Sequence, residues 1–287
     1  MGNLGSTRCG NKEFRWGERT FVMGIVNLSP DSFSGDGLTS SAAAIDQAQR
    51  MASEGADILD IGGESTRPGA SAVSIEEELK RTIPVIAQIA AKVTIPISID
   101  SYKYEVVRQA LDAGAALVND QWGLKKEPRL AELAAERKVP LILMSNQRDK
   151  GGFDAGIKRD TAYYDNIMVE LVASLRQSIE RASRAGVPGE NIIIDPGLGF
   201  GKTWKYDLWI IRRLEELKML GKPILLGPSR KSFIKMILDL PPDDRLEGTA
   251  AAVAIGIARG ADMVRVHDVR QMVRVCKVSD AIVRGGA

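Results

Sequence analysis

The feature that most constrains the fold of this chain is a repeated alternation of short apolar runs with longer stretches of helical pattern. Eight runs rich in Val, Ile and Leu recur, and most of them follow a glycine suited to ending a helix. They cover residues 21–27, 57–63, 96–101, 116–120, 140–145, 191–197, 223–229 and 262–268. Continuous apolar runs of this length are typical of parallel strands that are buried on both faces.

The segments between these runs have the pattern of amphipathic helices. Ser74 and Glu77 have capping-box spacing at the start of one such segment, and Gly186 ends another. Eight strands alternating with helices in a chain of this size predict an α/β fold, a single (β/α)8 TIM barrel. A doubly wound open sheet is the structural alternative, because a count of strands does not close a barrel.

Charge and cysteine content narrow the possible partners and compartments. The chain has 39 Lys and Arg against 37 Asp and Glu, a net charge of +2 that gives no reason to expect nucleic acid as a partner. Cys9 and Cys276 lack metal-ligand or redox spacing, so we expect reduced thiols in a cytoplasmic protein. No apolar run approaches the roughly 18 residues of a membrane span, and no membrane partner is expected. The opening "MGNLGS" fits a loose myristoylation pattern, which we interpret as a chance match in a disordered start.

Polar residues stand at the carboxyl end of every predicted strand. In chain order these ends are Asn27, Asp60, Asp100, Asn119, Ser145, Asp195, Ser229 and His267. Active sites of (β/α)8 barrels lie at this end, so the eight side chains would converge on one mouth. For Asp60 and Ser145 an ordinary strand-to-loop role is an equally good interpretation.

The sole histidine, His267, belongs to the last predicted strand. Arg265 and His267 are two positions apart and share one face of that strand, whereas Val264 and Val266 share the other. If the valines contact the helices, the arginine and histidine point into the mouth beside Asn27 of the first strand. A cation, an imidazole donor and an amide oxygen that can ligate Mg²⁺ together predict a phosphate or pyrophosphate site.

A glycine-rich stretch, "DPGLGFGKT", partly matches a nucleotide-binding loop. It ends in Gly201, Lys202 and Thr203, as a Walker A loop would, but Pro196 stands where the first glycine is required. A nucleotide-binding function is therefore weakly supported. We expect these glycines to allow a sharp turn above a ligand after the sixth strand.

Several motifs together resemble those of one enzyme family. They are "MGIVNLSPDSFSGDG", "DIGGESTRPGA", "ISIDS", "VND", "DPGLGFGKT", "SRKSF" and "RVHD". In this order and approximate spacing they resemble dihydropteroate synthases, from about Phe21 to the C-terminal helix. The resemblance implies an N-terminal extension over residues 1–20 and a pterin-binding barrel domain over 21–287. It also implies condensation of 7,8-dihydropterin-6-ylmethyl diphosphate with 4-aminobenzoate, giving 7,8-dihydropteroate and pyrophosphate for folate synthesis, with Mg²⁺ assisting.

The implied chemistry gives roles to residues around the pterin. An aromatic amine is neutral and nucleophilic at pH 7, so no strong base is needed. Departure of pyrophosphate leaves cationic character on the pterin, which a buried carboxylate would stabilise, and Asp100 in "ISIDS" is the candidate. By resemblance, Asn119 and Asp195 hold the pterin edge, Met144 and Phe200 line its slot, and Lys231 spans both substrates. Asp100, Lys231 and Asn27 are the expected catalytic residues.

The leaving group and the second substrate are assigned by the same resemblance. Asn27, Thr66, Arg67, Arg265 and His267 would bind the pyrophosphate, with Asn27 also the metal ligand. His267 is thus interpreted as an anion-binding donor and not as a general base. Phe33, Pro68, Ser232 and Lys231 would form the aminobenzoate site. Because the loops after the first two strands carry several of these residues, we expect aminobenzoate to bind only after the anion.

The chain departs from the family pattern after the fifth strand. Met144, Ser145 and Asn146 stand where the family usually has Met-His-Met, which puts the contribution of that histidine in doubt. Three other functions stay open: a pterin-binding methyltransferase, a catalytically silent binding barrel and a sugar-phosphate enzyme. The family also suggests a homodimer through the outer helices.

Overall fold

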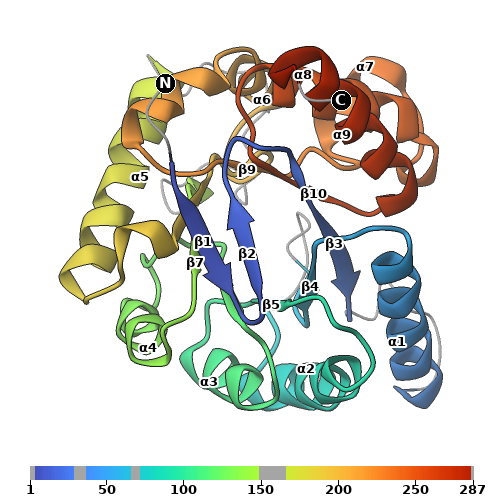
Figure 1. The fold of residues 1–287 in the computed structure, drawn as a ribbon, viewed down its shortest axis with the longest axis vertical. Helices are drawn as coiled ribbons and strands as arrows, with labels where there is room; N and C mark the ends of the chain where they lie inside the picture. The colour runs from blue at the N-terminus through green and yellow to red at the C-terminus, as the bar shows by residue number, and fades with distance from the viewer. Residues whose placement is uncertain (1–3, 29–36, 66–71, 149–165, 286–287) are drawn as a thin grey trace.

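The computed structural model describes residues 4–28, 37–65, 72–148 and 166–285. Eight parallel strands form its central sheet (Figure 1). They are β3 (Phe21–Asn27), β4 (Ile58–Gly62), β5 (Ile97–Asp100), β6 (Leu117–Asp120), β7 (Leu141–Met144), β8 (Ile192–Asp195), β9 (Leu225–Leu226) and β10 (Met263–Val266). Their hydrogen-bonded order is β8-β7-β6-β5-β4-β3-β10-β9.

The two edge strands of this order meet and close the sheet. A parallel bridge joins Ile194 of β8 to Ile224, directly before β9, and the Ile194 N–H donates to the Pro223 carbonyl at 2.9 Å. The (β/α)8 barrel is thereby confirmed against the open sheet. The strand expected over 223–229 is shorter than predicted, because regular pairing ends at Leu226.

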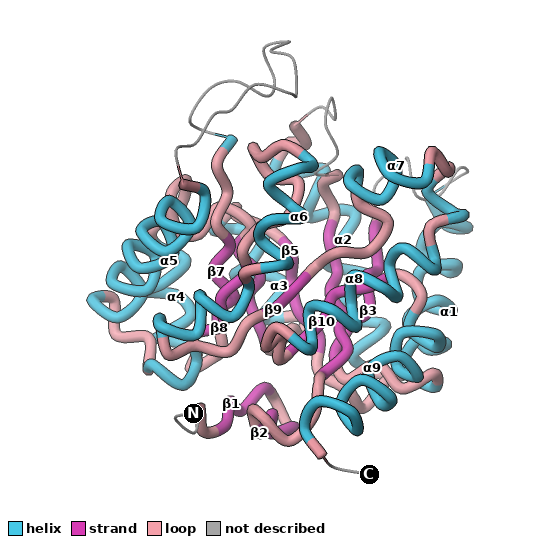
Figure 2. Tube along the Cα trace, turned by 90° about the horizontal axis from the view of Figure 1, so that it is seen from above, coloured by secondary structure: helices cyan, strands magenta, loops and turns pink. Residues whose placement is uncertain are grey.

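Helices surround the barrel and follow its strands along the chain (Figures 1 and 2). They are α1 (Gly37–Ser53), α2 (Ile75–Ala90), α3 (Tyr104–Asp112), α4 (Arg129–Arg137), α5 (Ile167–Arg184), α6 (Trp204–Arg212), α7 (Ser232–Leu238), α8 (Leu246–Ala258) and α9 (Val269–Arg284), with 3-10 turns η2 (Gly189–Asn191), η3 (Leu214–Leu220) and η4 (Pro242–Asp244). The predicted cap of α2 is present, since the Ser74 hydroxyl accepts from the Glu77 N–H at 3.2 Å. Among the described residues, none of the helices has the length and apolar content to cross a membrane.

Alternate residues of each strand face opposite ways, so apolar clusters form both between the strands and the helices and inside the barrel. Val264 and Val266 face outward and pack with the helices in the larger apolar cluster, as predicted. The inward residues of the lower barrel form a second cluster that includes Met23, Ile58 and Met263. This inner cluster fills the lower part of the barrel interior, so within the barrel itself a ligand would bind at the upper end.

A hairpin of the N-terminal segment covers the floor. It consists of β1 (Ser6–Cys9) and β2 (Lys12–Arg15), which pair antiparallel, and it lies across the lower end of the barrel (Figures 1 and 2). Phe14 and Trp16 pack against Phe21 with ring centroids 4.8 Å and 5.3 Å away, within the floor cluster. The expected disordered start is therefore wrong from Leu4 onward, because this segment closes the apolar barrel floor.

Candidate active site

The strand alternation that fills the floor also builds the site above it. Two residues beyond each floor residue, the same strand again points a side chain inward, one layer higher. The pairs of floor and upper residues are Ile58 and Asp60, Leu117 and Asn119, Ile142 and Met144, Ile193 and Asp195, Leu225 and Gly227, and Met263 and Arg265. Four of these six upper residues are polar, so the barrel interior becomes largely polar one layer above its apolar floor.

One pocket collects most of the residues predicted for the pterin. Its lining consists of Asp100, Asn119, Gln121, Met144, Asp195, Gly197, Leu198, Phe200, Gly227, Lys231 and Arg265. Strand register explains part of this convergence, since Asp100 is paired with Asn119 and Met144 with Asp195 on neighbouring strands. All six predicted pterin-site residues therefore line the same pocket, together with Arg265.

Arg265 is held between two carboxylates at the centre of the pocket. Its Nε donates to Asp60 Oδ2 at 2.5 Å, and its Nη2 donates to Asp100 Oδ2 at 2.7 Å. The same Asp60 oxygen accepts from Asn119 Nδ2 at 3.0 Å. Burial acts to lower the pKa of Arg265, but the charges of Asp60 and Asp100 outweigh it and raise that pKa. Asp60 is fully buried and thus orients two pocket side chains without lining the pocket itself.

Asp100 lines the pocket and has one oxygen without a hydrogen-bond partner in the described chain. Its Oδ1 is buried and has no hydrogen-bond partner within the described part of the chain. Burial raises the pKa of Asp100 to about 7, Arg265 opposes the rise and Asp60 adds to it. A donor or a positive charge that enters the pocket would satisfy this oxygen and favour the ionised carboxylate.

Asp195, the last residue of β8, and Lys231, in the loop after β9, flank the pocket. Asp195 Oδ1 accepts from the Gly197 N–H at 2.7 Å, and burial raises the pKa of Asp195. Lys231 Nζ lies 4.6 Å from the centre of the Phe200 ring. Burial, with Arg265 nearby, lowers the pKa of Lys231 to about 8, so this amine is mostly charged at pH 7. The pocket therefore presents acceptors on one side and a cation over an aromatic ring on the other.

His267 lies at the rim of the barrel and is bonded to Ser229. The Ser229 hydroxyl accepts from the His267 backbone N–H at 3.2 Å and lies 2.9 Å from His267 Nδ1. Since the hydroxyl has one hydrogen to donate, we assign it to Nδ1, which leaves the hydrogen of a neutral ring on Nε2. Burial, followed by the charges of Arg230 and Arg265, lowers the pKa of His267 to about 3. The ring is thus a neutral donor, which is the property that anion binding requires.

Other predicted residues fall outside this pocket or outside the described chain. Ser232 is exposed at the start of α7, and Asn27 is half-buried at the end of β3. Phe33, Thr66, Arg67 and Pro68 lie outside the described residues. Their assignments, like the pyrophosphate roles of Arg265 and His267, stay predictions.

The prediction missed several pocket residues that the same alternation could have found. Gln121 and Gly197 lie two positions beyond Asn119 and Asp195 and line the same pocket. Gly227 follows the floor residue Leu225 at the same spacing. Following the period-two pattern through the predicted runs, and one residue past the run 116–120, would have named all three.

Comparison with known proteins settles the family. Residues 23–267 match the family model described as pterin binding enzyme. A dihydropteroate synthase of Clostridium beijerinckii is 48% identical over 279 residues, covering 96% of this chain and 99% of that protein.

The chain belongs to the dihydropteroate synthase family.

Solved structures of the family agree with the fold. The dihydropteroate synthase from Clostridium difficile, crystallised in the presence of pteroic acid, has a TM-score of 0.87 and 46% identity, covering 94% of this chain and 99% of that one. The enzyme from Xanthomonas albilineans with 4-aminobenzoic acid has a TM-score of 0.87 and 40% identity, covering 96% and 97%. This dihydropteroate synthase barrel is thus matched over nearly its whole length.

The segment that departs from the family pattern has a clear structural role in this dihydropteroate synthase. Asn146 is fully buried, its Nδ2 donates to the Gln121 carbonyl at 3.0 Å, and its Oδ1 accepts from the Arg148 N–H at 3.0 Å. The neighbouring Ser145 hydroxyl accepts from Gln147 Nε2 at 3.0 Å. These hydrogen bonds hold the backbone at Gln121, which lines the pocket. Ser145 and Asn146 therefore support the pocket without lining it.

Proposed function

We propose that this chain condenses 7,8-dihydropterin-6-ylmethyl diphosphate with 4-aminobenzoate, giving 7,8-dihydropteroate and pyrophosphate. The observation that carries the proposal is the pocket in which Asp100, Asn119, Asp195 and Lys231 converge, within a chain of this family. Its relatives were crystallised with pteroic acid and with 4-aminobenzoic acid, which correspond to the oxidised product framework and one substrate.

The pterin ring is bound through its edge. Its ring N–H and exocyclic amino groups donate to carboxylates, and its ring nitrogens and carbonyl accept from amides and ammonium groups. Asp195 and Asn119 supply the complementary acceptor and donor, while Met144 and Phe200 cover the ring faces. The Asn119 side chain enters this role already oriented by Asp60.

Asp100 stabilises the reacting pterin. When the bond to the diphosphate oxygen lengthens, the electron pair leaves with pyrophosphate and positive character develops on the ring. The ionised Asp100 carboxylate, which lines the pocket, interacts more strongly with that charge than with the neutral ground state. The amine of 4-aminobenzoate then attacks the methylene carbon and loses a proton.

The pyrophosphate is held on the Arg265 side of the mouth. His267 offers a neutral Nε2–H donor at the rim, and Asn27 ends the neighbouring strand. Among the described residues there is no cluster of three or more carboxylate, His or Cys side chains that could hold a metal. Mg²⁺ is usually held by substrate phosphates, waters and one or two protein oxygens, so a single protein oxygen at this place is a donor set that fits it. Asn27 would supply its amide oxygen, and the ion would neutralise charge on the leaving group.

Lys231 and Ser232 face the second substrate at the start of α7. Arg230, which has a left-handed backbone with φ 57°, fixes this turn through its guanidinium bonds to Asp268 at 2.8 Å and Asp243 at 2.6 Å. Lys231 is thereby aimed into the pocket, and the exposed Ser232 hydroxyl is left to the aminobenzoate carboxylate.

The test of the function is direct product formation. The chain is incubated with the pterin diphosphate, 4-aminobenzoate and Mg²⁺, and pyrophosphate and dihydropteroate are measured together. Equal amounts of both are expected, and the metal requirement is read from the same assay with chelator added. Pyrophosphate without dihydropteroate would indicate a hydrolase, and neither product would reject the proposal.

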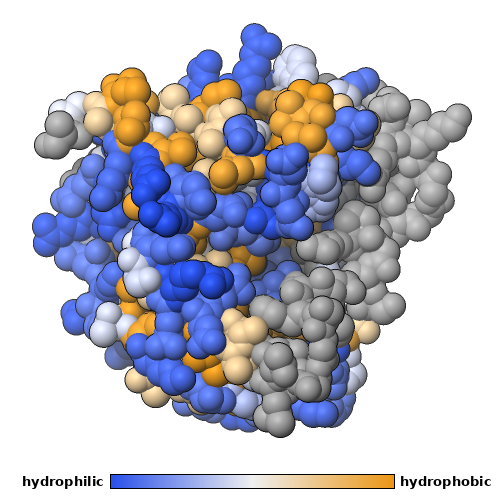
Figure 3. All heavy atoms as spheres, turned by 90° about the vertical axis from the view of Figure 1, so that its right-hand side faces the viewer, coloured by the Kyte–Doolittle hydropathy of each residue, from blue (hydrophilic) through white to orange (hydrophobic). Residues whose placement is uncertain are grey.

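We further propose that the enzyme is a cytoplasmic homodimer. Large apolar side chains are exposed on the adjacent helices α6, α7 and α8, namely Trp209, Met236, Ile237, Leu238 and Ile255. Figure 3 shows apolar side chains gathered along the upper part of the side on which Figure 1 places α7 and α8. Light scattering should give twice the mass of one chain, and Ile237→Glu should halve it, whereas Ile282→Glu on α9 should not.

A further inference from the structure

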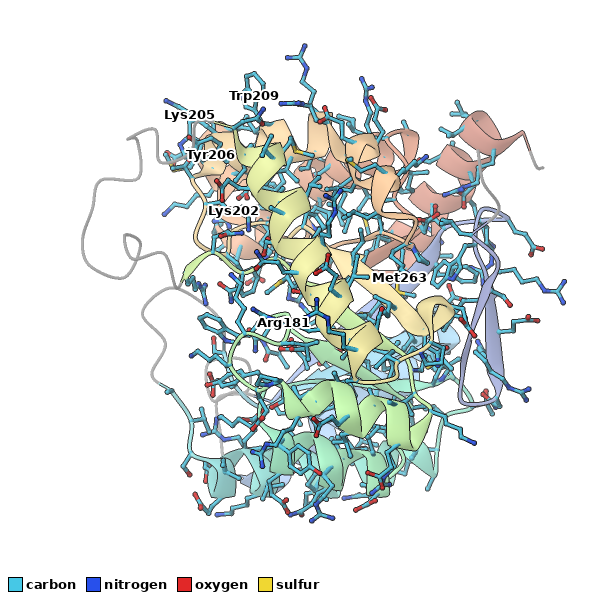
Figure 4. All side chains as sticks on the ribbon, turned by 90° about the vertical axis from the view of Figure 1, so that its left-hand side faces the viewer. Arg181, Lys202, Lys205, Tyr206, Trp209 and Met263 are labelled. Carbon is cyan, nitrogen blue, oxygen red and sulfur yellow. The ribbon has the colours of Figure 1, made fainter. Side chains whose placement is uncertain are left out.

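One buried lysine sits behind the pterin pocket without lining it. Lys202 lies in the loop between β8 and α6 and is 3% exposed. Figure 4 shows it at the mouth end of the barrel, away from the N-terminal hairpin. Its Nζ donates to three backbone carbonyls, those of Ser145 at 2.7 Å, Gly197 at 2.9 Å and Phe200 at 3.1 Å. An ammonium group has three hydrogens to donate, so all are used.

These three carbonyls belong to the two segments that form one wall of the pocket. Gly197 and Phe200 come from the loop after β8, and both line the pocket. Ser145 directly follows Met144, which lines the pocket from the end of β7. A single cation therefore ties the end of β7 to the loop after β8.

The loop around Lys202 has a backbone that only glycine adopts readily. Gly197, Gly199 and Gly201 have φ values of 68°, 79° and 70°. A Cβ on Gly197 would lie 2.5 Å from the Ser145 oxygen, and one on Gly201 would lie 2.4 Å from the Gln147 carbonyl carbon. The loop is thus pressed against the segment after β7, with its carbonyls turned inward. Without a cation, three carbonyl dipoles would converge on an unfilled, buried point, which is unfavourable.

A buried carboxylate holds the same loop from its other side. Asp207 of α6 is fully buried, and its Oδ1 accepts from the Gly199 N–H at 2.9 Å. Burial lowers the pKa of Lys202 to about 7, and the charges of Asp207 and Asp195 oppose that fall. Burial likewise raises the pKa of Asp207 to about 7, and the charge of Lys202 opposes that rise. The loop carbonyls are thus bound by the Lys202 amine, while a loop N–H is bound by the Asp207 carboxyl group.

We propose that Lys202 is a positioning residue of the pterin site, an internal cation whose three carbonyl bonds fix the pocket wall formed by Gly197, Leu198 and Phe200. This inference rests on the proposed function. It also agrees with the weak Walker A match of the "GKT" triplet, because every hydrogen of the ammonium is committed to a carbonyl of the chain itself.

The test is chemical rescue of pterin binding. Lys202→Ala should bind 6-hydroxymethyl-7,8-dihydropterin on the order of tenfold or more weakly by calorimetry, because the displaced wall no longer fits the ring. Added ethylammonium, which can occupy the emptied carbonyl cage, should restore much of that affinity and raise the melting temperature of the variant. Ethanol should do neither. Lys205→Ala, a charge loss at an exposed position of α6, is the matched control and should bind as wild type does.

Several outcomes would overturn the inference. Wild-type affinity in Lys202→Ala, or in the volume-conserving Lys202→Met, would show that the cation does not shape the wall. So would a variant whose melting temperature and pterin affinity are both unaffected by ethylammonium. Failure of the wild-type chain to bind the pterin would instead reject the proposed function, and the rise in melting temperature with ethylammonium would still test the cation cage.

Discussion

Substituting Asp60 by Asn should extend activity toward acidic pH by changing the ionisation of a different residue. Asp60 Oδ2 accepts from both Arg265 and Asn119, whereas its Oδ1 has no hydrogen-bond partner within the described chain. An Asn side chain at position 60 can place its oxygen where Asp60 Oδ2 lies and its NH₂ group where Oδ1 lies. Both bonds are then kept and only the negative charge is removed.

The size of the effect follows from the geometry around the guanidinium. Asp60 and Asp100 accept from two nitrogens of the same Arg265 guanidinium, so their charged oxygens are close neighbours. Two unit charges about 4 Å apart repel by about 4 kcal/mol at an effective dielectric constant of about 20, which exceeds the ~1.4 kcal/mol of a tenfold change in ionisation. With the pKa of Asp100 at about 7, wild type should show about a tenth of its plateau kcat/KM at pH 6. At the same pH, Asp60→Asn should keep about half or more of its own plateau kcat/KM.

The assay is kcat/KM for pyrophosphate release between pH 5 and 9. Asp57→Asn is the matched control, because Asp57 forms a comparable pair with Arg19 at the barrel floor, with Nη2 to Oδ1 at 2.6 Å. The acidic limb of the pH profile of kcat/KM for Asp57→Asn should coincide with that of wild type. An acidic limb that stays in place in Asp60→Asn, or moves to higher pH, would refute the electrostatic reasoning.

Three further predictions address the rim, the scaffold and the order of binding. His267→Ala should weaken pyrophosphate about tenfold in calorimetry yet leave 6-hydroxymethyl-7,8-dihydropterin unaffected, and equal pyrophosphate affinity would remove His267 from the anion site. Lys103→Met should lower the free energy of unfolding by about 3–5 kcal/mol in urea titrations, because Lys103 Nζ neutralises the half-buried Glu64 at 2.6 Å and the buried Glu78 at 2.5 Å. A loss of unfolding free energy below about 1 kcal/mol, as expected for the surface pair of Arg129 and Glu127, would contradict this. Aminobenzoate should bind measurably only with Mg²⁺, pyrophosphate and a pterin present, and equal affinity without them would mean a preformed pocket.

The barrel could be predicted from the sequence because its signal is local and repeated. Each strand is a continuous apolar run, and the pocket side chains Asn119, Asp195 and Arg265 share the inward face with apolar floor residues two positions earlier. The closure through Ile194 and Ile224 was not predictable in the same way, since it is a contact between distant segments that no local pattern encodes.

The missed features depend on such distant partners. From the sequence, a strand-to-loop role for Asp60 was as good an interpretation as a role in the site. Its role in the structure comes from its bond to Arg265, which lies 205 positions further along the chain. The N-terminal hairpin was missed although Gly10 and Asn11 form the two-residue turn that its register implies. Its strands have four residues each and owe their burial to the barrel floor. Lys202 had a motif but no sequence signal for the carbonyls that bind it.

The central claim, that the Asp100 carboxylate stabilises the positive pterin in the transition state, is tested most directly by single-turnover kinetics of Asp100→Asn. The amide keeps the shape of the side chain and can still accept from Arg265 Nη2, so the variant should fold and should bind the pterin diphosphate with nearly unchanged affinity. The rate of the chemical step should fall on the order of 10² to 10³, because only the interaction with the developing charge is lost. A folded variant with a near-normal rate would contradict the account.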